Sequence, residues 1–138
     1  MTHEEGVLDT NVIAALTAYD PSDLPAEFLI TAVTLGELSH GPHATSDPVK
    51  RAKRMAVLQH VESTFDVLPY DRDAARIYGQ ICAAVIAIGR RPRGRSADLM
   101  IAATAAGNGL PLYTADPKDF EGLDGIVEIV GVERPDGA

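Results

Sequence analysis

Hydrophobic and polar positions divide the chain into short apolar runs and longer stretches in which apolar residues recur every three or four positions. The longer stretches are typical of helices. Elements of the two kinds follow one another along the chain, which predicts an α/β fold with a mainly parallel sheet and helices on both faces. The apolar runs predict β-strands at residues 7–8, 28–31, 67–68, 112–114 and 126–130.

Local signals mark the ends of two long helices. Asp47 precedes a proline and predicts the start of a helix that runs to about residue 63. Asp71 opens the next helix, and Gly89 is placed to end it. The second half of that helix, residues 81–88, is apolar on all sides. We therefore expect it to be buried on more than one side, against its own core or a second subunit.

The composition predicts one globular domain that spans residues 1–138. No apolar run reaches the ~20 residues that span a bilayer, and the start, MTHEEG, has no signal-peptide pattern. The single cysteine cannot form an internal disulfide, so we expect a cytoplasmic protein that makes no use of a membrane.

The net charge of −8, from 12 basic and 20 acidic residues, argues against broad, non-specific binding of nucleic acid. A basic cluster in a predicted loop qualifies this, although an isolated run of this kind is usually a solvated surface. Its members are Arg90, Arg91, Arg93 and Arg95.

Four acidic residues lie where a catalytic site would form, although each also has a structural explanation. Asp9 fits a helix N-cap, and Asp116, before a proline, fits a turn. Glu37 fits a capping box that starts at Thr34, and Asp98 suits the positive end of a helix dipole.

These separate structural explanations do not account for the shared placement of the four residues at strand ends and helix starts. Asp9 and Asp116 follow predicted strands, while Glu37 and Asp98 fall in what we expect to be the first turns of helices. In a parallel sheet these positions converge at the carboxyl edge. Four carboxylates there would repel one another unless a cation compensates, and oxygen ligands select Mg²⁺ or Mn²⁺. Such a site is suited to phosphodiester hydrolysis.

The segments LDTNV, TLGEL, SADLMIAATA and LYTADPKDF resemble, in order and spacing, the motifs of PIN-domain ribonucleases, most closely the VapC-type toxins of toxin–antitoxin pairs. The resemblance covers nearly the whole chain. It implies a three-layer α/β/α sandwich, a divalent-metal site and cleavage of structured RNA such as tRNA. It also implies a homodimer and inhibition by a small cognate antitoxin.

Carried over residue by residue, the resemblance makes an acidic quartet of Asp9, Glu37, Asp98 and Asp116, with the three aspartates as metal ligands. The last motif also contains Asp119, which is the alternative to Asp116 as the fourth carboxylate. In this setting the loop arginines become candidate phosphate contacts, since a guanidinium binds phosphate bidentately. Supporting roles fall to Thr10, Asn11, Thr114 and Asp119.

Other classes can use a similar acidic pocket. A metal-dependent DNA nuclease or phosphohydrolase is one alternative, and an inactive PIN-like binding module is another. Aspartyl-phosphate phosphatases need a second aspartate two residues after the first, and Asn11 stands there instead. All four acidic positions are filled, which argues against the inactive module.

Overall fold

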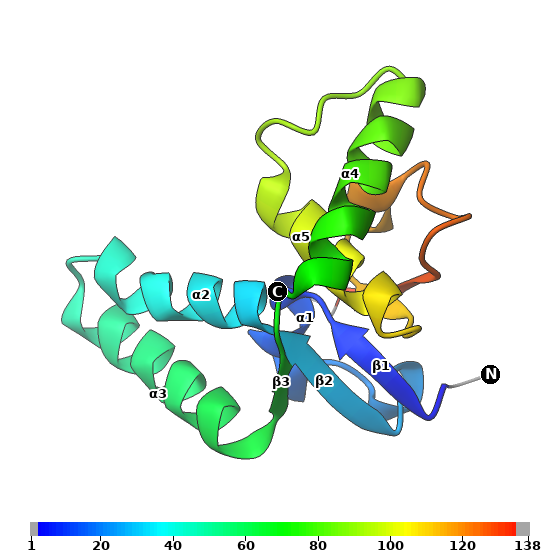
Figure 1. Cartoon of the computed structure of the whole chain (residues 1–138). Coiled ribbons are helices and arrows are strands. Elements are labelled where there is room, and N and C mark those ends of the chain that lie inside the picture. Colours follow the sequence, from blue (N-terminus) through cyan, green and yellow to red (C-terminus); the bar gives the residue numbers. More distant parts are fainter. Residues whose placement is uncertain (1–2, 135–138) are drawn as a thin grey trace.

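The computed structural model describes residues 3–134 and contains a five-stranded sheet at its centre (Figure 1). The strand order is β3-β2-β1-β4-β5, and every neighbouring pair is parallel. This confirms the predicted α/β class and the parallel sheet. The strands are β1 (Glu5–Leu8), β2 (Glu27–Thr31), β3 (Asp66–Leu68), β4 (Leu112–Thr114) and β5 (Ile129–Gly131).

Helices cover both faces of this sheet. Figure 1 shows α2 and α3 as a hairpin that extends away from the sheet, while α4 and α5 pack together elsewhere. The α-helices are α1 (Thr10–Ile13), α2 (Ala32–His40), α3 (Pro48–Thr64), α4 (Arg72–Ala87) and α5 (Ser96–Gly107). Single turns of 3₁₀ helix form η1 (Leu16–Ala18), η2 (Pro21–Asp23), η3 (Gly41–Ala44) and η4 (Pro117–Phe120).

The central strands separate two hydrophobic cores because successive side chains of a strand point to opposite faces. Val7 belongs to the core under α4 and α5, together with Leu99. Its neighbour Leu8 belongs to the core under α1, α2 and α3, together with Leu38 and Val61. The three layers of the expected α/β/α sandwich follow from this alternation.

The predicted helix starts are confirmed in detail. The side chain of Asp47 accepts a hydrogen bond from the Val49 N–H at 2.9 Å, and Asp71 accepts one from Ala74 at the same distance. Each satisfies a backbone donor that the first helical turn leaves free. After α4 the chain turns through Gly89 with φ of +80°, a conformation that favours glycine.

The last predicted strand is wrong in its position. The prediction was 126–130, whereas the strand spans Ile129–Gly131. The backbone N–H groups of Ile126 and Val127 donate to the Leu123 carbonyl at 2.8 and 3.0 Å, so these apolar residues form a turn. Val127 still reaches the core from that turn, which is why its hydrophobicity resembled a strand.

The second half of α4 is not buried on all sides within the chain. Ile81 and Val85 are buried, whereas Ile86 is 62% and Ile88 45% exposed. The expectation of burial on more than one side is therefore wrong for the single chain. An apolar strip remains on the outer side of α4, and Ile86 and Ile88 are its large members.

The topology brings three strand ends to one edge. β1, β2 and β4 are neighbours and parallel, so Leu8, Thr31 and Thr114 end their strands on the same side of the sheet. A helix or turn begins within a few residues of each. Among the described residues, no helix is long and apolar enough to cross a bilayer.

Candidate active site

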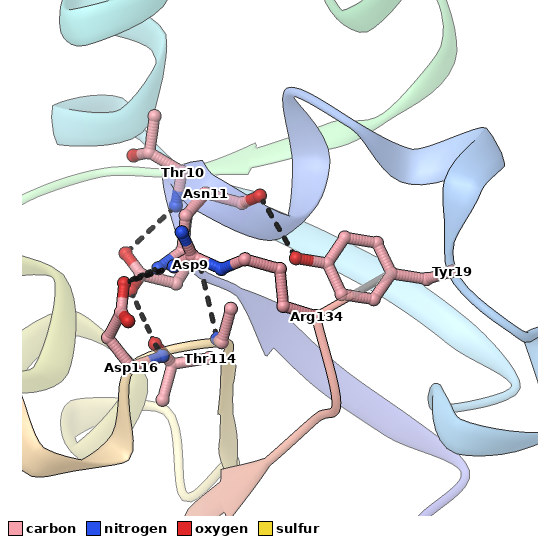
Figure 2. Close-up of polar contacts among 8 residues, drawn as sticks. Asp9, Thr10, Asn11, Tyr19, Thr114, Asp116 and Arg134 are labelled. Carbon is pink, nitrogen blue, oxygen red and sulfur yellow. Dashed lines mark hydrogen bonds and ion pairs between the residues drawn. The ribbon is translucent and has the colours of Figure 1, made fainter. Parts of the chain in front are cut away.

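Asp9 lies at the centre of this edge, directly after β1 (Figure 2). One carboxylate oxygen accepts the Thr10 N–H at 2.8 Å and the other accepts the Thr114 hydroxyl at 2.8 Å. The residue is only 4% exposed. Burial raises the pKa of Asp9 to about 6, and the charges of Asp98 and Glu37 add to the rise, against the two hydrogen bonds. Asp9 is thus both the N-cap of α1 and part of an acidic group.

Glu37 faces this group from α2, held by a threonine. Thr10 Oγ1 lies 2.6 Å from Glu37 Oε1 and 3.1 Å from the hydroxyl of Thr34. The expected capping box at Thr34 is wrong, because Thr31 is the N-cap and accepts the Thr34 N–H at 3.1 Å. Glu37 consequently lies in the second turn of α2 rather than the first, and its side chain binds Thr10 in the site instead of capping the helix.

Asp116 closes the site from the loop after β4. Its Oδ2 accepts from Asn11 Nδ2 at 2.9 Å, and Asn11 Oδ1 in turn accepts the Ala115 N–H at 3.3 Å. Asn11 therefore ties α1 to the loop that carries Asp116. The same Asp116 oxygen pairs with Arg134 at 2.7 Å (Figure 2).

Asp98 enters from the first turn of α5 and is half-buried. Burial raises the pKa of Asp98, and the charges of Asp119, Glu37 and Asp116 raise it further, while Arg95 opposes them. No hydrogen bond to the Asp98 carboxylate comes from any residue in the described range 3–134. Asp9 and Asp98 are thus the two site carboxylates with a raised pKa, and only Asp9 of these two has hydrogen-bond donors in that range.

The structure thus brings all five predicted carboxylates into one electrostatic group. Carboxylate oxygens suit a hard divalent cation, and Mg²⁺ in proteins is commonly held by one or two carboxylates and keeps several waters. Within residues 3–134, no three His, Cys, Asp or Glu side chains are grouped so that together they could hold a metal ion. The chemistry of these donors therefore suits a hard cation that one or two carboxylates bind and that water completes.

The loop arginines divide into two pairs. Arg90 donates to the Lys118 carbonyl at 2.6 Å and pairs with Glu121 at 3.1 Å, and Arg95 reaches the Asp119 carbonyl at 3.4 Å. These two fasten the loop to η4. The other pair, Arg91 and Arg93, is exposed.

Two residues of the site were not predicted from the sequence. Thr34 is fully buried and contacts Thr10, and Arg134 pairs with Asp116. The short segment TAVTLGEL carries a signal for Thr34, namely a second threonine one turn before Glu37. No local pattern marks Arg134.

Comparison with known proteins identifies the class that this fold and site define. The family description "PIN domain" matches residues 6–126, and the chain belongs to the PIN domain family. Within it, the chain groups with the VapC ribonucleases, as the motifs predicted.

Two relatives illustrate this grouping. Ribonuclease VapC5 of Mycobacterium tuberculosis is 40% identical over 95% of this chain and 98% of the relative. The tRNA(fMet)-specific endonuclease VapC of Shigella flexneri is 34% identical over 87% of this chain and 92% of the relative.

Solved structures agree. The chain is similar to one in the VapBC-5 toxin–antitoxin structure from Mycobacterium tuberculosis, with a TM-score of 0.81 and 38% identity over 95% of this chain and 99% of that one. It is also similar to one in DNA-bound VapBC from Salmonella typhimurium, with a TM-score of 0.69 and 27% identity over 94% and 97% of the two chains.

The titration of Asp9 yields a test in metal-free protein. The folded-state pKa of about 6 lies above the ordinary 3.8, so the ionised group opposes folding above pH 6. Stability from this group is gained as the pH falls through 6 and is complete below the unfolded pKa. Between pH 7.5 and 4.5 the gain is about 2 kcal/mol. Asp9→Asn, measured by urea unfolding in chelator, should lose this gain.

Asp124→Asn is the matched control, because Asp124 is exposed and lies outside the site. Its pH dependence should equal that of the parent. If Asp9→Asn is less stable than the parent at every pH and its pH dependence is unchanged, Asp9 is a helix cap only.

Proposed function

We propose that the chain is an endoribonuclease that depends on Mg²⁺ or Mn²⁺ and acts as the toxin of a toxin–antitoxin pair. One observation carries the proposal: carboxylates from four segments crowd at one sheet edge, where Asp98 is half-buried without a hydrogen bond from the described residues. Crowded, partly buried carboxylates destabilise the metal-free protein, and a bound cation offsets that cost.

The residues divide the work by position. Asp9, Asp98 and Asp116 are the proposed metal ligands, of which one or two would bind the cation directly and the others through its waters. The cation would supply an activated water and offset charge on the phosphate. Glu37 lies at the exposed side, where it can accept a proton from the attacking water. Three polar side chains position the carboxylates by hydrogen bonds: Thr10 donates to Glu37, Thr114 to Asp9 and Asn11 to Asp116. Asp119 adds a further negative charge beside Asp98.

RNA is the favoured substrate, because the relatives named above are ribonucleases, and the name of one states tRNA. A DNA nuclease or phosphohydrolase would use the same carboxylates, so the substrate has to be tested directly. An inactive binding module has no reason to keep the Asp98 carboxylate without a hydrogen-bond donor among the described residues, and this argues against that alternative.

We assign substrate contact to the arginine loop. Arg90 and Arg95 hold its shape, which leaves the exposed Arg91 and Arg93 to meet phosphates beside the acidic pocket. Their charge offsets the repulsion that an acidic protein exerts on RNA.

We further propose two protein partners. A cognate small antitoxin is supported by similar chains that were solved as VapBC complexes, and an acidic pocket is a natural receptor for its arginine or lysine. A second copy of the chain would cover the apolar strip of α4. The cytoplasm is the compartment where such RNA substrates and a reduced Cys82 occur together.

Cleavage by the purified chain tests the catalytic proposal. Structured RNA should be cut with Mg²⁺ or Mn²⁺ but not in chelator. Asp9→Asn and Asp98→Asn should each lower the rate about 100-fold or more, the scale that follows from disturbing a metal site. Asp124→Asn, purified identically, should cut at the parent's rate. Undiminished cleavage in chelator, or preferred cleavage of DNA, would contradict the assignment.

Salt dependence of RNA binding tests the arginine loop. In an Asp98→Asn background without metal, replacing Arg91 and Arg93 by glutamine should lower the slope of log affinity against log salt by ~0.7 to 0.9 per lost phosphate contact. The control replaces Arg72 and Arg76, which are exposed on α4 and carry the same charge. Equal changes in both double variants would assign the loop to the solvated surface.

Oligomeric state tests the α4 strip. Ile86→Glu places a charge in the centre of the proposed interface, so light scattering should give the monomer mass where the parent gives the dimer mass. Val49→Glu is the matched control, because Val49 is 63% exposed on α3. A monomeric parent, or a dimeric Ile86→Glu variant, would rule out this surface.

A further inference from the structure

Arg134 reaches the acidic site from the last described residue of the chain. Its Nη2 donates to Asp116 Oδ2 at 2.7 Å, and both side chains are about half exposed, at 48% and 46%. Of the ion pairs among residues 3–134, this one alone includes a carboxylate of the candidate site. Figure 2 shows the Arg134 side chain extended toward Asp116.

The backbone delivers Arg134 to this place. Just after β5, the Val132 N–H donates to the Thr114 carbonyl at 2.8 Å, and the Val132 side chain is 6% exposed in the core beside Leu8. Arg134 follows this anchor by two residues. Because Thr114 itself binds Asp9, the segment that carries Arg134 is fixed to the strand that supports the site.

The contact occupies one of the two oxygens of Asp116, a proposed metal ligand. Asp116 Oδ2 already accepts from Asn11 Nδ2 at 2.9 Å, so with Arg134 it has two donors. A divalent cation at Asp116 has to displace the guanidinium or bind beside it against charge repulsion. The Asp98 carboxylate, in contrast, is not paired with an arginine. The charge of Arg95 lowers the pKa of Asp98, but the Arg95 guanidinium donates its hydrogen bond to the Asp119 carbonyl.

We propose that Arg134 is a tethered counter-ion of the acidic pocket, which holds Asp116 in the metal-free protein and competes there with the divalent cation. The inference rests on the proposed function, in that the cation binds this pocket. Arg134 stabilises the carboxylate cluster before metal arrives, and it weakens the metal affinity by the free energy of its own ion pair.

Metal affinity of the full chain tests this without reference to activity. Titration calorimetry with Mn²⁺ at low salt should give a Kd for Arg134→Gln about two- to fivefold lower than for the parent, the range that an exposed ion pair supports. Arg134→Lys keeps the charge and loses the planar fork, so its Kd should lie between the two. The ratio between Arg134→Gln and the parent should shrink as salt is raised.

Two controls locate the effect at Asp116. Arg76→Gln removes the same charge from an exposed position on α4 and should leave the Kd unchanged. In an Asp116→Asn background, Arg134→Gln should cause no further tightening, because the paired carboxylate is already gone.

The outcomes separate this inference from the proposed function. An equal or higher Kd for Arg134→Gln, with Mn²⁺ still bound by the parent, overturns the competition and leaves the metal site intact. Tightening that persists in the Asp116→Asn background overturns the pairing as its cause. Absence of Mn²⁺ binding to every variant overturns the metal site, and the competition with it.

Discussion

Burial of negative charge at one edge of the sheet, to which repulsion between the carboxylates adds, is the constraint on which the rest of the site depends. Asp9 is nearly buried, and its pKa rises to about 6 because its charge is costly there. Hydrogen bonds from four residues offset part of that cost: Thr114 and Thr10 donate to Asp9, and Asn11 and Arg134 donate to Asp116. The carboxylates of Asp98 and Asp119 have no such donor among the described residues, since Arg95 donates to the Asp119 carbonyl. The site is held in a state that favours the arrival of positive charge.

The strand order makes this arrangement possible. β1 lies between β2 and β4, so Asp9 has a neighbouring strand end on each side. On one side the chain continues into α2 and Glu37, and on the other into the loop of Asp116. The helix α5 then adds Asp98 from above one face of the sheet. Four segments that are distant in sequence thus bring their carboxylates to one place, and the PIN domain match over residues 6–126 includes all four.

The sequence predicts those parts of the structure that depend on local chemistry. Strand-end aspartates, caps such as Asp47 and Asp71, and the layered α/β class all follow from patterns within a few residues. The errors arise where a distant contact decides. Thr31 rather than Thr34 caps α2, and the apolar run near Val127 packs as a turn. Arg134 finds Asp116 only after β5 has paired with β4, and no local pattern encodes that.

The position of β1 also bears on how the chain is made. The first strand to be synthesised becomes the middle of the sheet, and Asp9 must wait for Thr114, more than a hundred residues later, to gain its second hydrogen bond. Asp98 and Asp116 likewise leave the ribosome late. A nascent chain therefore holds Asp9 without Asp98 and Asp116 through most of translation. The full group of carboxylates forms only when most of the chain has been made.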